Sequence, residues 1–267
     1  MTAIAVTIAG SDSSGGAGIQ ADLKTFSALG VYGASVITAL TAQNTRGVQA
    51  IHDVPPSFVA GQMDSVFSDL SVGAVKIGML SRPDVIRAVA EGLDRHGARH
   101  VVLDPVMVAT SGDRLLSPDA VEGLRALLLP RALLVTPNLP EAAAILEEDI
   151  AETEEAVTDQ AERILRLGPK AVLLKGGHGT GPESIDILVD ASGTRRLASP
   201  RVPTRNTHGT GCTLSSAVAA GLARGLDLAA SVDAAKAYVS AAIAASDRIT
   251  VGSGHGPVHH FHAIWGR

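Results

Sequence analysis

Short apolar runs that end in polar residues alternate along this chain with segments of helical periodicity. Such alternation predicts parallel strands joined by helices, so we expect a mostly parallel central sheet with helices on both faces. The expected strands are 3–9, 34–40, 74–80, 101–105, 133–138 and 171–178, and the expected helices are 19–29, 55–67, 83–96, 118–128, 152–167, 214–223 and 226–248. Two further runs, 184–189 and 194–197, predict a late antiparallel hairpin. The sequence has no internal repeat, linker or break in composition, which predicts a single domain over 1–267.

The composition narrows the classes of function. The 267 residues are 46% hydrophobic with a mean hydropathy of +0.24, which is enough to bury a large core. A net charge of −5 and an aromatic content of 3% argue against a nucleic-acid partner. No uncharged apolar run is long enough to span a bilayer, so no membrane partner is expected. The single cysteine fits a reducing compartment and residues 1–9 lack the basic start of a signal peptide, so we expect a cytoplasmic protein.

The polar stretch 206–213 directly precedes an apolar helix. A glycine-containing turn that leads into a helix presents unpaired N–H groups and the positive end of the helix dipole, so it favours an anion such as phosphate. Gly209 and Gly211 let the backbone approach that anion closely. Cys212 and Thr213 fall in the first turn, where the pKa of a thiol is expected to be lowered. The alternative is an ordinary helix start with a threonine N-cap.

Polar residues follow several of the expected strands. Asp104 ends one strand, at the edge of the sheet where open α/β proteins place their chemistry. Asn138 and Glu141 lie across a helix start and either share a Mg²⁺–phosphate site or form an N-cap and its partner. The histidines from His255 to His262 have no cysteine or acidic companion at metal-ligand spacing, so zinc is not expected there.

The loop 10–18 consists of small residues and suits the close approach of a small polar ligand, although it lacks the spacing of a dinucleotide-binding loop. Asp22, one turn into the next helix, either points back at that ligand or complements the helix dipole. Gln43 either pairs with a ring nitrogen beside an amino group or faces water. Met79 is either a core residue or a ligand contact.

Six short motifs occur in order along nearly the whole chain. They are 10–18 (GSDSSGGAG), 104–107 (DPVM), 136–142 (TPNLPEA), 175–178 (KGGH), 206–213 (NTHGTGCT) and 254–258 (GHGPV). Each motif alone is weak, but together they resemble the hydroxymethylpyrimidine/phosphomethylpyrimidine kinase family of thiamine biosynthesis. The resemblance implies an α/β protein with a ribokinase-like, three-layer α/β/α fold, and it implies a homodimer.

The resemblance also implies the reaction. A kinase of this family phosphorylates 4-amino-5-hydroxymethyl-2-methylpyrimidine twice, first to the monophosphate and then to the diphosphate, with ATP and Mg²⁺ as cofactors. The expected partners are therefore small molecules, the pyrimidine and ATP.

The roles of the family's site residues are carried over to the matching positions of this sequence. The pyrimidine would be held by Asp22 and Gln43, surrounded by Gly10, Met79 and Val106. Mg²⁺ and the phosphates would be organised by Asp104, Asn138 and Glu141, with Asp104 and Glu141 as metal ligands, directly or through water. Lys175 would reach the ATP phosphates, and Lys236 would lie near the nucleotide. The anion hole would consist of Gly209, Thr210, Gly211, Cys212 and Thr213, with Cys212 where most relatives carry an aspartate base. One departure is Thr110, because relatives often carry a lysine before 111–113.

Cys212 is the informative difference from the relatives. The first acceptor is a primary alcohol, which benefits from a base, whereas the second acceptor is a phosphate that is already an anion. A fixed carboxylate would repel that phosphate by about 4 kcal/mol at contact and an effective dielectric constant near 20. A cysteine can be neutral in one step and a thiolate in the other, so we expect Cys212 to allow one site to carry out both steps.

Two other functions are compatible with the sequence. A pyridoxine or pyridoxal kinase has the same fold and a ring of similar size with a hydroxymethyl group, although Gln43 and Cys212 favour the aminopyrimidine. A non-catalytic ligand sensor is the other alternative, and the retained Asp104 and Lys175 argue against it.

Overall fold

The computed structural model describes residues 1–107, 117–177 and 181–266. Its centre is an eight-stranded sheet in the order β10-β9-β8-β7-β6-β5-β1-β2. The strands are β1 (Ile4–Ala9), β2 (Tyr32–Ile37), β5 (Ala74–Ile77), β6 (Val101–Leu103), β7 (Leu134–Val135), β8 (Ala171–Leu174), β9 (Glu183–Asp190) and β10 (Gly193–Pro200). All neighbouring strands are parallel except β8–β9 and β9–β10, so the predicted parallel sheet with a late antiparallel hairpin is confirmed.

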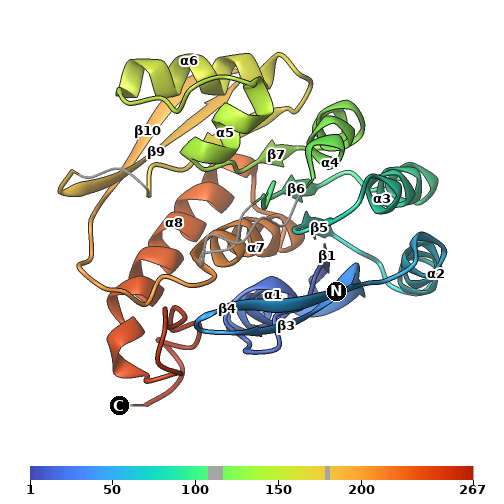
Figure 1. Cartoon of the computed structure of the whole chain (residues 1–267), viewed down its shortest axis with the longest axis horizontal. Coiled ribbons are helices and arrows are strands. Elements are labelled where there is room, and N and C mark those ends of the chain that lie inside the picture. The colour runs from blue at the N-terminus through green and yellow to red at the C-terminus, as the bar shows by residue number, and fades with distance from the viewer. Residues whose placement is uncertain (108–116, 178–180, 267) are drawn as a thin grey trace.

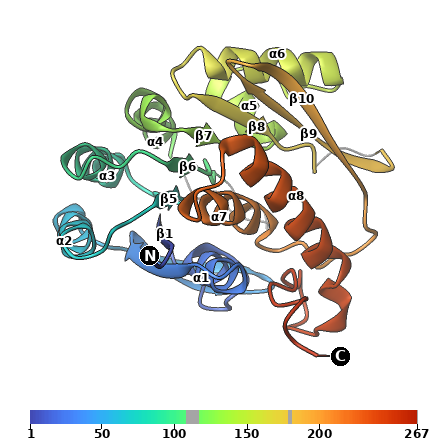
Figure 2. The same cartoon turned by 180° about the vertical axis from the view of Figure 1, so that it is seen from behind.

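Helices cover both faces of the sheet, which gives the expected three layers (Figures 1 and 2). One face carries α1 (Gly18–Ala28), α7 (Thr210–Ala223) and α8 (Leu228–Ala244). The other face carries α2 (Pro56–Phe67), α3 (Pro83–Arg95), α4 (Pro118–Gly123), α5 (Leu139–Leu146) and α6 (Glu154–Leu165). Short turns of π-helix at Leu124–Leu128 and of 3-10 helix at Leu129–Arg131 follow α4, and another 3-10 turn at Ser246–Arg248 follows α8.

The strands place apolar and polar side chains on different faces. Val6 on β1 and Val75 on β5 belong to the core that α2 to α6 cover. Because successive residues of a strand point to opposite faces, Thr7 and Lys76 lie on the face that α1 and α7 cover. The same alternation places Asp104, which follows β6, on that face. Polar groups therefore lie in a row beneath α7.

A buried ion pair joins four elements on this face. Lys76 Nζ lies 2.9 Å from both carboxylate oxygens of Asp22 on α1, and both side chains are 0% exposed. Asp22 also accepts hydrogen bonds from Thr7 Oγ1 (2.6 Å) and from Ser216 Oγ on α7 (2.7 Å). Burial disfavours the ammonium, but the attraction of Asp22 outweighs it, so the pKa of Lys76 lies above its ordinary value. A buried charge is tolerated only when it is paired in this way.

A two-stranded antiparallel sheet departs from the sequence prediction. A strand was expected over 34–40 with a loop after it, but β2 ends at Ile37 and the chain continues as β3 (Ala39–Asn44) and β4 (Gly47–Asp53). The hairpin lies along the loop that follows β1, because Ser11 N donates to the Ala39 carbonyl (2.9 Å). Its second strand is largely exposed, so no apolar alternation marks it in the sequence.

The helical segment Leu228–Arg248 is, by length and composition alone, apolar enough to cross a membrane, with a mean hydropathy of 1.3. In the structure α8 packs against α7, and it buries Ser231, Val232, Ala235, Val239 and Ala242. Asp233 and Lys236 of the same helix form ion pairs with Arg195 and Asp186. These are the contacts of a helix that covers a sheet.

Replacing Lys76 by methionine should destabilise the protein by about 3–5 kcal/mol, because the Asp22 carboxylate is left buried without a counter-ion. The double variant Asp22→Asn/Lys76→Met should lose less stability than Lys76→Met, because it leaves no unpaired buried charge. Urea unfolding followed by circular dichroism measures both free energies of unfolding. Lys170→Met, at an exposed lysine, is the control and should change stability by less than about 0.5 kcal/mol. Equal losses in the single and double variants would contradict the prediction.

Candidate active site

The loop after β1 is held in shape by Asp12. Its carboxylate, 1% exposed, accepts hydrogen bonds from the backbone N–H groups of Ser14 (2.8 Å), Gly16 (3.1 Å) and Ala17 (2.8 Å). The ring Nε2 of His208, from the segment before α7, lies 2.8 Å from the same carboxylate. Burial raises the pKa of Asp12, but the hydrogen bonds from His208 and the loop outweigh it and hold the pKa well below its usual range. The loop 10–18 and the segment 206–213 are thereby brought together.

Gly209 is the N-cap of α7, and only glycine fits there. Its φ of +78° is in the left-handed region. A Cβ at this position would lie 1.9 Å from the carbonyl oxygen of Gly16, so any side chain would push the two loops apart.

The start of α7 provides part of the predicted anion hole. The N–H groups of Thr210 and Thr213 donate to the carbonyls of Thr207 and Gly209. The N–H groups of Gly211 and Cys212 have no hydrogen-bond partner among the residues that the structure describes. Two adjacent N–H groups at the positive end of a helix are suited to hold a phosphate oxygen.

Thr213 was predicted to contact phosphate, but the structure places its side chain in the interior. Its hydroxyl donates to the Gly209 carbonyl (2.8 Å) and lies 3.0 Å from His260 Nε2, and the side chain is 0% exposed. Thr213 therefore stabilises the helix start from inside. The hydroxyl of Thr210, which is partly exposed, donates to the Thr207 carbonyl (2.7 Å).

An ammonium and two carboxylates meet next to this helix start. Lys175, one residue after β8, places Nζ 2.8 Å from Asp104 Oδ1 and 3.8 Å from Glu141 Oε2. Asp104 also accepts hydrogen bonds from Thr136 Oγ1 (3.2 Å) and Ser215 Oγ (3.3 Å). A Cβ on Gly211 would be 3.2 Å from Lys175 Nζ, so the anion hole and the lysine face the same space.

Asn138 and Glu141 form the capping box of α5. Asn138 Oδ1 accepts from Glu141 N (2.9 Å), and Glu141 Oε2 accepts from Asn138 N (2.8 Å). The N-cap alternative is therefore confirmed for this pair. The box also fixes Glu141, only 6% exposed, beside Lys175, which leaves the role of Glu141 toward a cation open.

The pKa values of Glu141 and Asp104 are shifted in opposite directions. Burial, reinforced by the charge of Asp104, raises the pKa of Glu141 to about 7, although Lys175 opposes the rise. Burial also acts on Asp104, but the attraction of Lys175 and Lys76 outweighs it and lowers the pKa of Asp104. No group of three or more His, Cys, Asp or Glu side chains at metal-binding spacing occurs in the described part of the chain. Two crowded carboxylates that share one ammonium nevertheless suit Mg²⁺, which keeps several waters and completes its shell with phosphate oxygens.

The residues predicted around the pyrimidine occupy different depths. Met79, 8% exposed, packs on the β1 loop, with its Cε 3.0 Å from the position of a Cβ on Gly10. Gln43 lies on β3, where its backbone N–H donates to Ser13 Oγ (2.8 Å) and its side-chain Oε1 accepts from Thr41 Oγ1 (3.1 Å). Val106 is partly exposed and follows Asp104 at the end of β6.

Asp22 is a second correction, because its carboxylate does not face the ligand space. It is 0% exposed and its oxygens are used by Thr7, Lys76 and Ser216, so it reaches the site only through these groups. Lys76 was missed by the sequence analysis. The available signal was a single charged residue in the otherwise apolar strand Ala74–Ile77.

Lys236 also reaches the site indirectly. Its Nζ lies 2.7 Å from Asp186 Oδ2, and Asp186 Oδ1 accepts from Gly176 N (2.9 Å). Lys236 therefore supports the backbone next to Lys175, and its expected contact with a nucleotide stays a prediction.

The thiol of Cys212 differs from the expectation of a lowered pKa. Burial raises the pKa of this thiol to about 11, and the attraction of Lys76 opposes the rise only in part. Asp22 and Asp104 repel a thiolate and add to the rise. The thiol is therefore neutral near pH 7 in the absence of substrate. The prediction of a lowered pKa, which considered only the helix start, is wrong.

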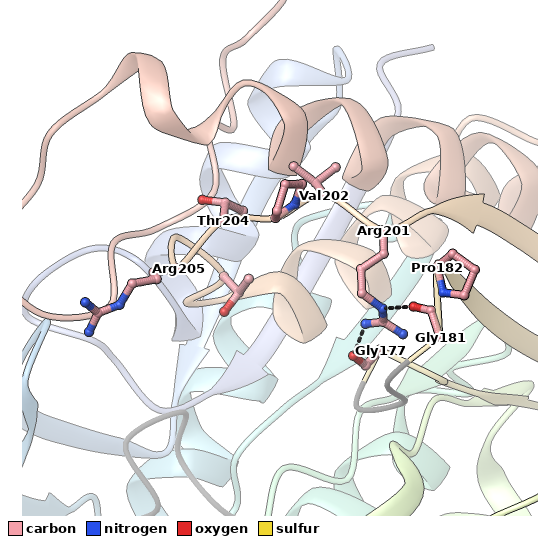
Figure 3. Close-up of a pocket in the computed structure, with 9 residues that line it drawn as sticks. Gly177, Gly181, Pro182, Arg201, Val202, Thr204 and Arg205 are labelled. Atoms are coloured by element: carbon pink, nitrogen blue, oxygen red, sulfur yellow. Dashed lines mark hydrogen bonds between the residues drawn. The ribbon is translucent and has the colours of Figure 1, made fainter.

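A groove of about 720 Å³ lies between the end of β8 and the segment before α7. It is lined by Gly177, Gly181, Pro182, Arg201, Val202, Pro203, Thr204, Arg205 and Thr207. Figure 3 shows the Arg201 guanidinium turned toward the carbonyls of Gly177 and Gly181, to which it donates at 2.7 and 2.8 Å. Arg201 thus fixes one wall of the groove. Thr110 and His178, which were part of the sequence motifs, lie outside the described residues.

The chain has a three-layer α/β/α fold, and Lys175 is paired with Asp104 beside a helix N-terminus. This fold and site are those of a small-molecule kinase with a ribokinase-like fold. The chain belongs to the phosphomethylpyrimidine kinase family, whose model matches residues 12–259.

Relatives extend over the whole chain. It is 64% identical, over 99% of both chains, to a hydroxymethylpyrimidine/phosphomethylpyrimidine kinase of Rhizobium meliloti. It is 53% identical to the thiamine biosynthesis bifunctional protein ThiED of Geobacter sulfurreducens, over 96% of this chain and 51% of that protein. Among solved structures, the ADP complex of Bacillus subtilis pyridoxal kinase is similar with a TM-score of 0.91 and 36% identity, over 98% of this chain and 99% of that one.

Glu141→Gln should change the pH dependence of stability while it retains the capping box, which glutamine also forms. Because the pKa of Glu141 is raised in the folded protein, the folded state binds this proton more tightly than the unfolded state. The wild-type protein therefore loses stability as the pH rises from about 4.5 to about 7. Thermal unfolding without metal should show the variant gaining stability relative to wild type at pH 8 but not at pH 4.5. Glu152→Gln, at an exposed site, should show no such gain, and a gain that is equal at both pH values would contradict the prediction.

Proposed function

We propose that the chain transfers phosphoryl groups from ATP, first to 4-amino-5-hydroxymethyl-2-methylpyrimidine and then to the resulting monophosphate, in thiamine biosynthesis. The observation that carries the proposal is the pair of N–H groups at Gly211 and Cys212, which have no partner in the described part of the chain and lie beside Lys175, in a chain of this family. Phosphoryl transfer depends mainly on positioning and on neutralising charge, and this arrangement supplies both.

The geometry supports the phosphate-binding roles in this proposal. The N–H groups of Gly211 and Cys212 hold oxygens of the transferred phosphoryl group, and the Lys175 ammonium neutralises its charge. Asp104 and Glu141 would hold Mg²⁺, which supplies further neutralisation between the ATP phosphates. Lys175 lies between the two carboxylates and moderates their repulsion when the site is free of metal.

ATP extends from this point toward the groove beside Arg201. The groove begins at Gly177, two residues after Lys175, and ends at Thr207, three residues before α7. We assign the adenosine to this groove because it adjoins the phosphate site through two segments: the residues that follow Lys175 and the residues that precede α7. The similarity to a kinase solved with ADP supports a nucleotide in this fold.

The acceptor binds beside the β1 loop and the β3–β4 hairpin, next to Met79 and Gln43. Met79 and Val106 provide apolar contacts for the ring, and Gly10 lets it approach the backbone. The Gln43 amide pairs with a ring nitrogen and the neighbouring amino group. Two further proposals rest on the resemblance and the single cysteine: the protein is a homodimer and acts in the cytoplasm.

We propose that Cys212 serves both acceptors because its charge can differ between the two steps. A thiol with a raised pKa does not repel the phosphate of the second acceptor, in contrast to an aspartate. In the first step the thiol first releases its proton to solvent, which the nearby positive charges favour, and the resulting thiolate then accepts the proton of the attacking hydroxyl.

A pyridoxal kinase activity is the second candidate, because a pyridoxal kinase shares the fold with a TM-score of 0.91. The products decide between the two. Mass spectrometry after reaction with MgATP and the hydroxymethylpyrimidine should show the diphosphate, and a parallel reaction with pyridoxine should be much slower. Turnover of pyridoxine alone would move the assignment to the second candidate, and monophosphate alone would remove the second step.

Cys212→Asp should impair the second phosphorylation much more than the first. A repulsion of about 4 kcal/mol corresponds to a loss on the order of a thousandfold in the second step. Each step is assayed separately, starting from the alcohol or from the monophosphate. Cys212→Ser is the matched control, because its side chain is neutral and does not ionise near pH 7: it should retain the second step, while the first step, which uses the thiolate as a base, is slowed. Retention of both rates to the same extent in Cys212→Asp would disprove the repulsion argument.

A further inference from the structure

Two helix N-termini meet at the Cys212 sulfur. Gly18, the first residue of α1, donates its N–H to that sulfur, and Cys212 itself lies in the first turn of α7. One turn deeper on the same face of each helix lie Asp22 on α1 and Ser216 on α7, which are joined by a hydrogen bond of 2.7 Å. Lys76 Nζ, bound to Asp22, therefore lies one helical turn below the sulfur.

The Lys76 ammonium is directed toward the site end of β5. A Cβ on Gly78 would lie 2.8 Å from Lys76 Nζ, so the lysine fills the space beneath the bend that leads to Met79. The ammonium has no contact with solvent, because the side chain is 0% exposed. A charge in such an environment acts on its neighbours with little screening.

We propose that Lys76 is a positioning residue of this kinase: its buried ammonium, held by Asp22 one helical turn below the Cys212 sulfur, acts on the reaction through that thiol, with Asp22 as the opposing charge. The inference deepens the proposed function, on which it rests only for its consequence in turnover. The charged groups that act on the sulfur are Lys76 from β5, Asp22 from α1, Asp104 from the end of β6 and Lys175 from the end of β8.

The signs of these contributions separate a charge effect from a structural one. Lys76 favours the thiolate, whereas Asp22 and Asp104 disfavour it. Removing the lysine should therefore make the thiol harder to ionise, and removing the Asp22 charge should make it easier. Looser packing would expose the sulfur in either variant and would raise its reactivity in both.

The test is the alkylation of Cys212 by iodoacetamide between pH 7.5 and 9.5, followed by intact mass. Cys212 is the only cysteine of the chain, so one added carbamidomethyl group reports it without ambiguity. Only the thiolate reacts, and one unit of pKa is about a tenfold change in its fraction at these pH values. The measurement uses the full chain without substrate, so its result is independent of which acceptor the enzyme uses.

Lys76→Met should be alkylated at least tenfold more slowly than wild type, and Asp22→Asn at least threefold faster. Lys170→Met is the matched control and should equal wild type. If Lys76→Met does not fold, Asp22→Asn/Lys76→Met is compared with Asp22→Asn, and the lysine substitution should again slow the reaction. Unchanged rates, or faster alkylation in both single variants, would overturn the inference.

A readout in turnover separates this inference from the proposed function. Lys76→Met should lower kcat of the first phosphorylation more than that of the second, with the KM for ATP little changed. If the alkylation rates shift as expected but the two steps fall equally, Lys76 controls the thiol, and the role proposed for Cys212 in the first step is wrong.

Discussion

The Asp12 carboxylate is the group on which the geometry of the site depends. It accepts three backbone N–H groups of the loop after β1 and faces His208 from a segment nearly two hundred residues away in sequence. Hydrogen bonds to a charged group each contribute about 1.5–3 kcal/mol. Together these hydrogen bonds hold Gly16 against Gly209. This contact positions the start of α7 next to the end of the sheet. The anion hole is thus positioned by a loop that carries none of its N–H groups.

Much of this arrangement could be predicted from the sequence. Asp104, Glu141 and Lys175 follow consecutive parallel strands, and the carboxyl ends of such strands share one edge of the sheet. The β3–β4 hairpin was missed because its exposed second strand has no apolar alternation. The burial of Asp22 was not predictable either, because its partner Lys76 is on a strand whose neighbours are known only once the sheet order is known.

The charge state of Cys212 shows the limit of local reasoning most clearly. A helix start favours an anion, and the sequence around the cysteine contains nothing that opposes it. The opposing effects come from burial and from Asp22 and Asp104, which lie 190 and 108 residues away in the chain. The same neighbourhood contains Lys76 and Lys175, so cations and carboxylates alternate around the sulfur. Such a site can accept acceptors of different charge, because no single sign of potential dominates it.

The contact between the two ends of the chain has a consequence for folding. His208 pairs in parallel with Pro257, and the Thr45 carbonyl accepts the N–H of His255, so residues from three distant parts of the sequence close around the loop after β1. Contacts between residues so far apart in sequence form late in folding, because closing the long loop between them costs entropy before the contacts can stabilise the protein. Strands β1 to β8 can assemble from neighbouring segments, whereas the phosphate site requires residues near 258. During synthesis on the ribosome, the sheet can therefore precede a functional site, and an interrupted chain would be folded in part but inactive.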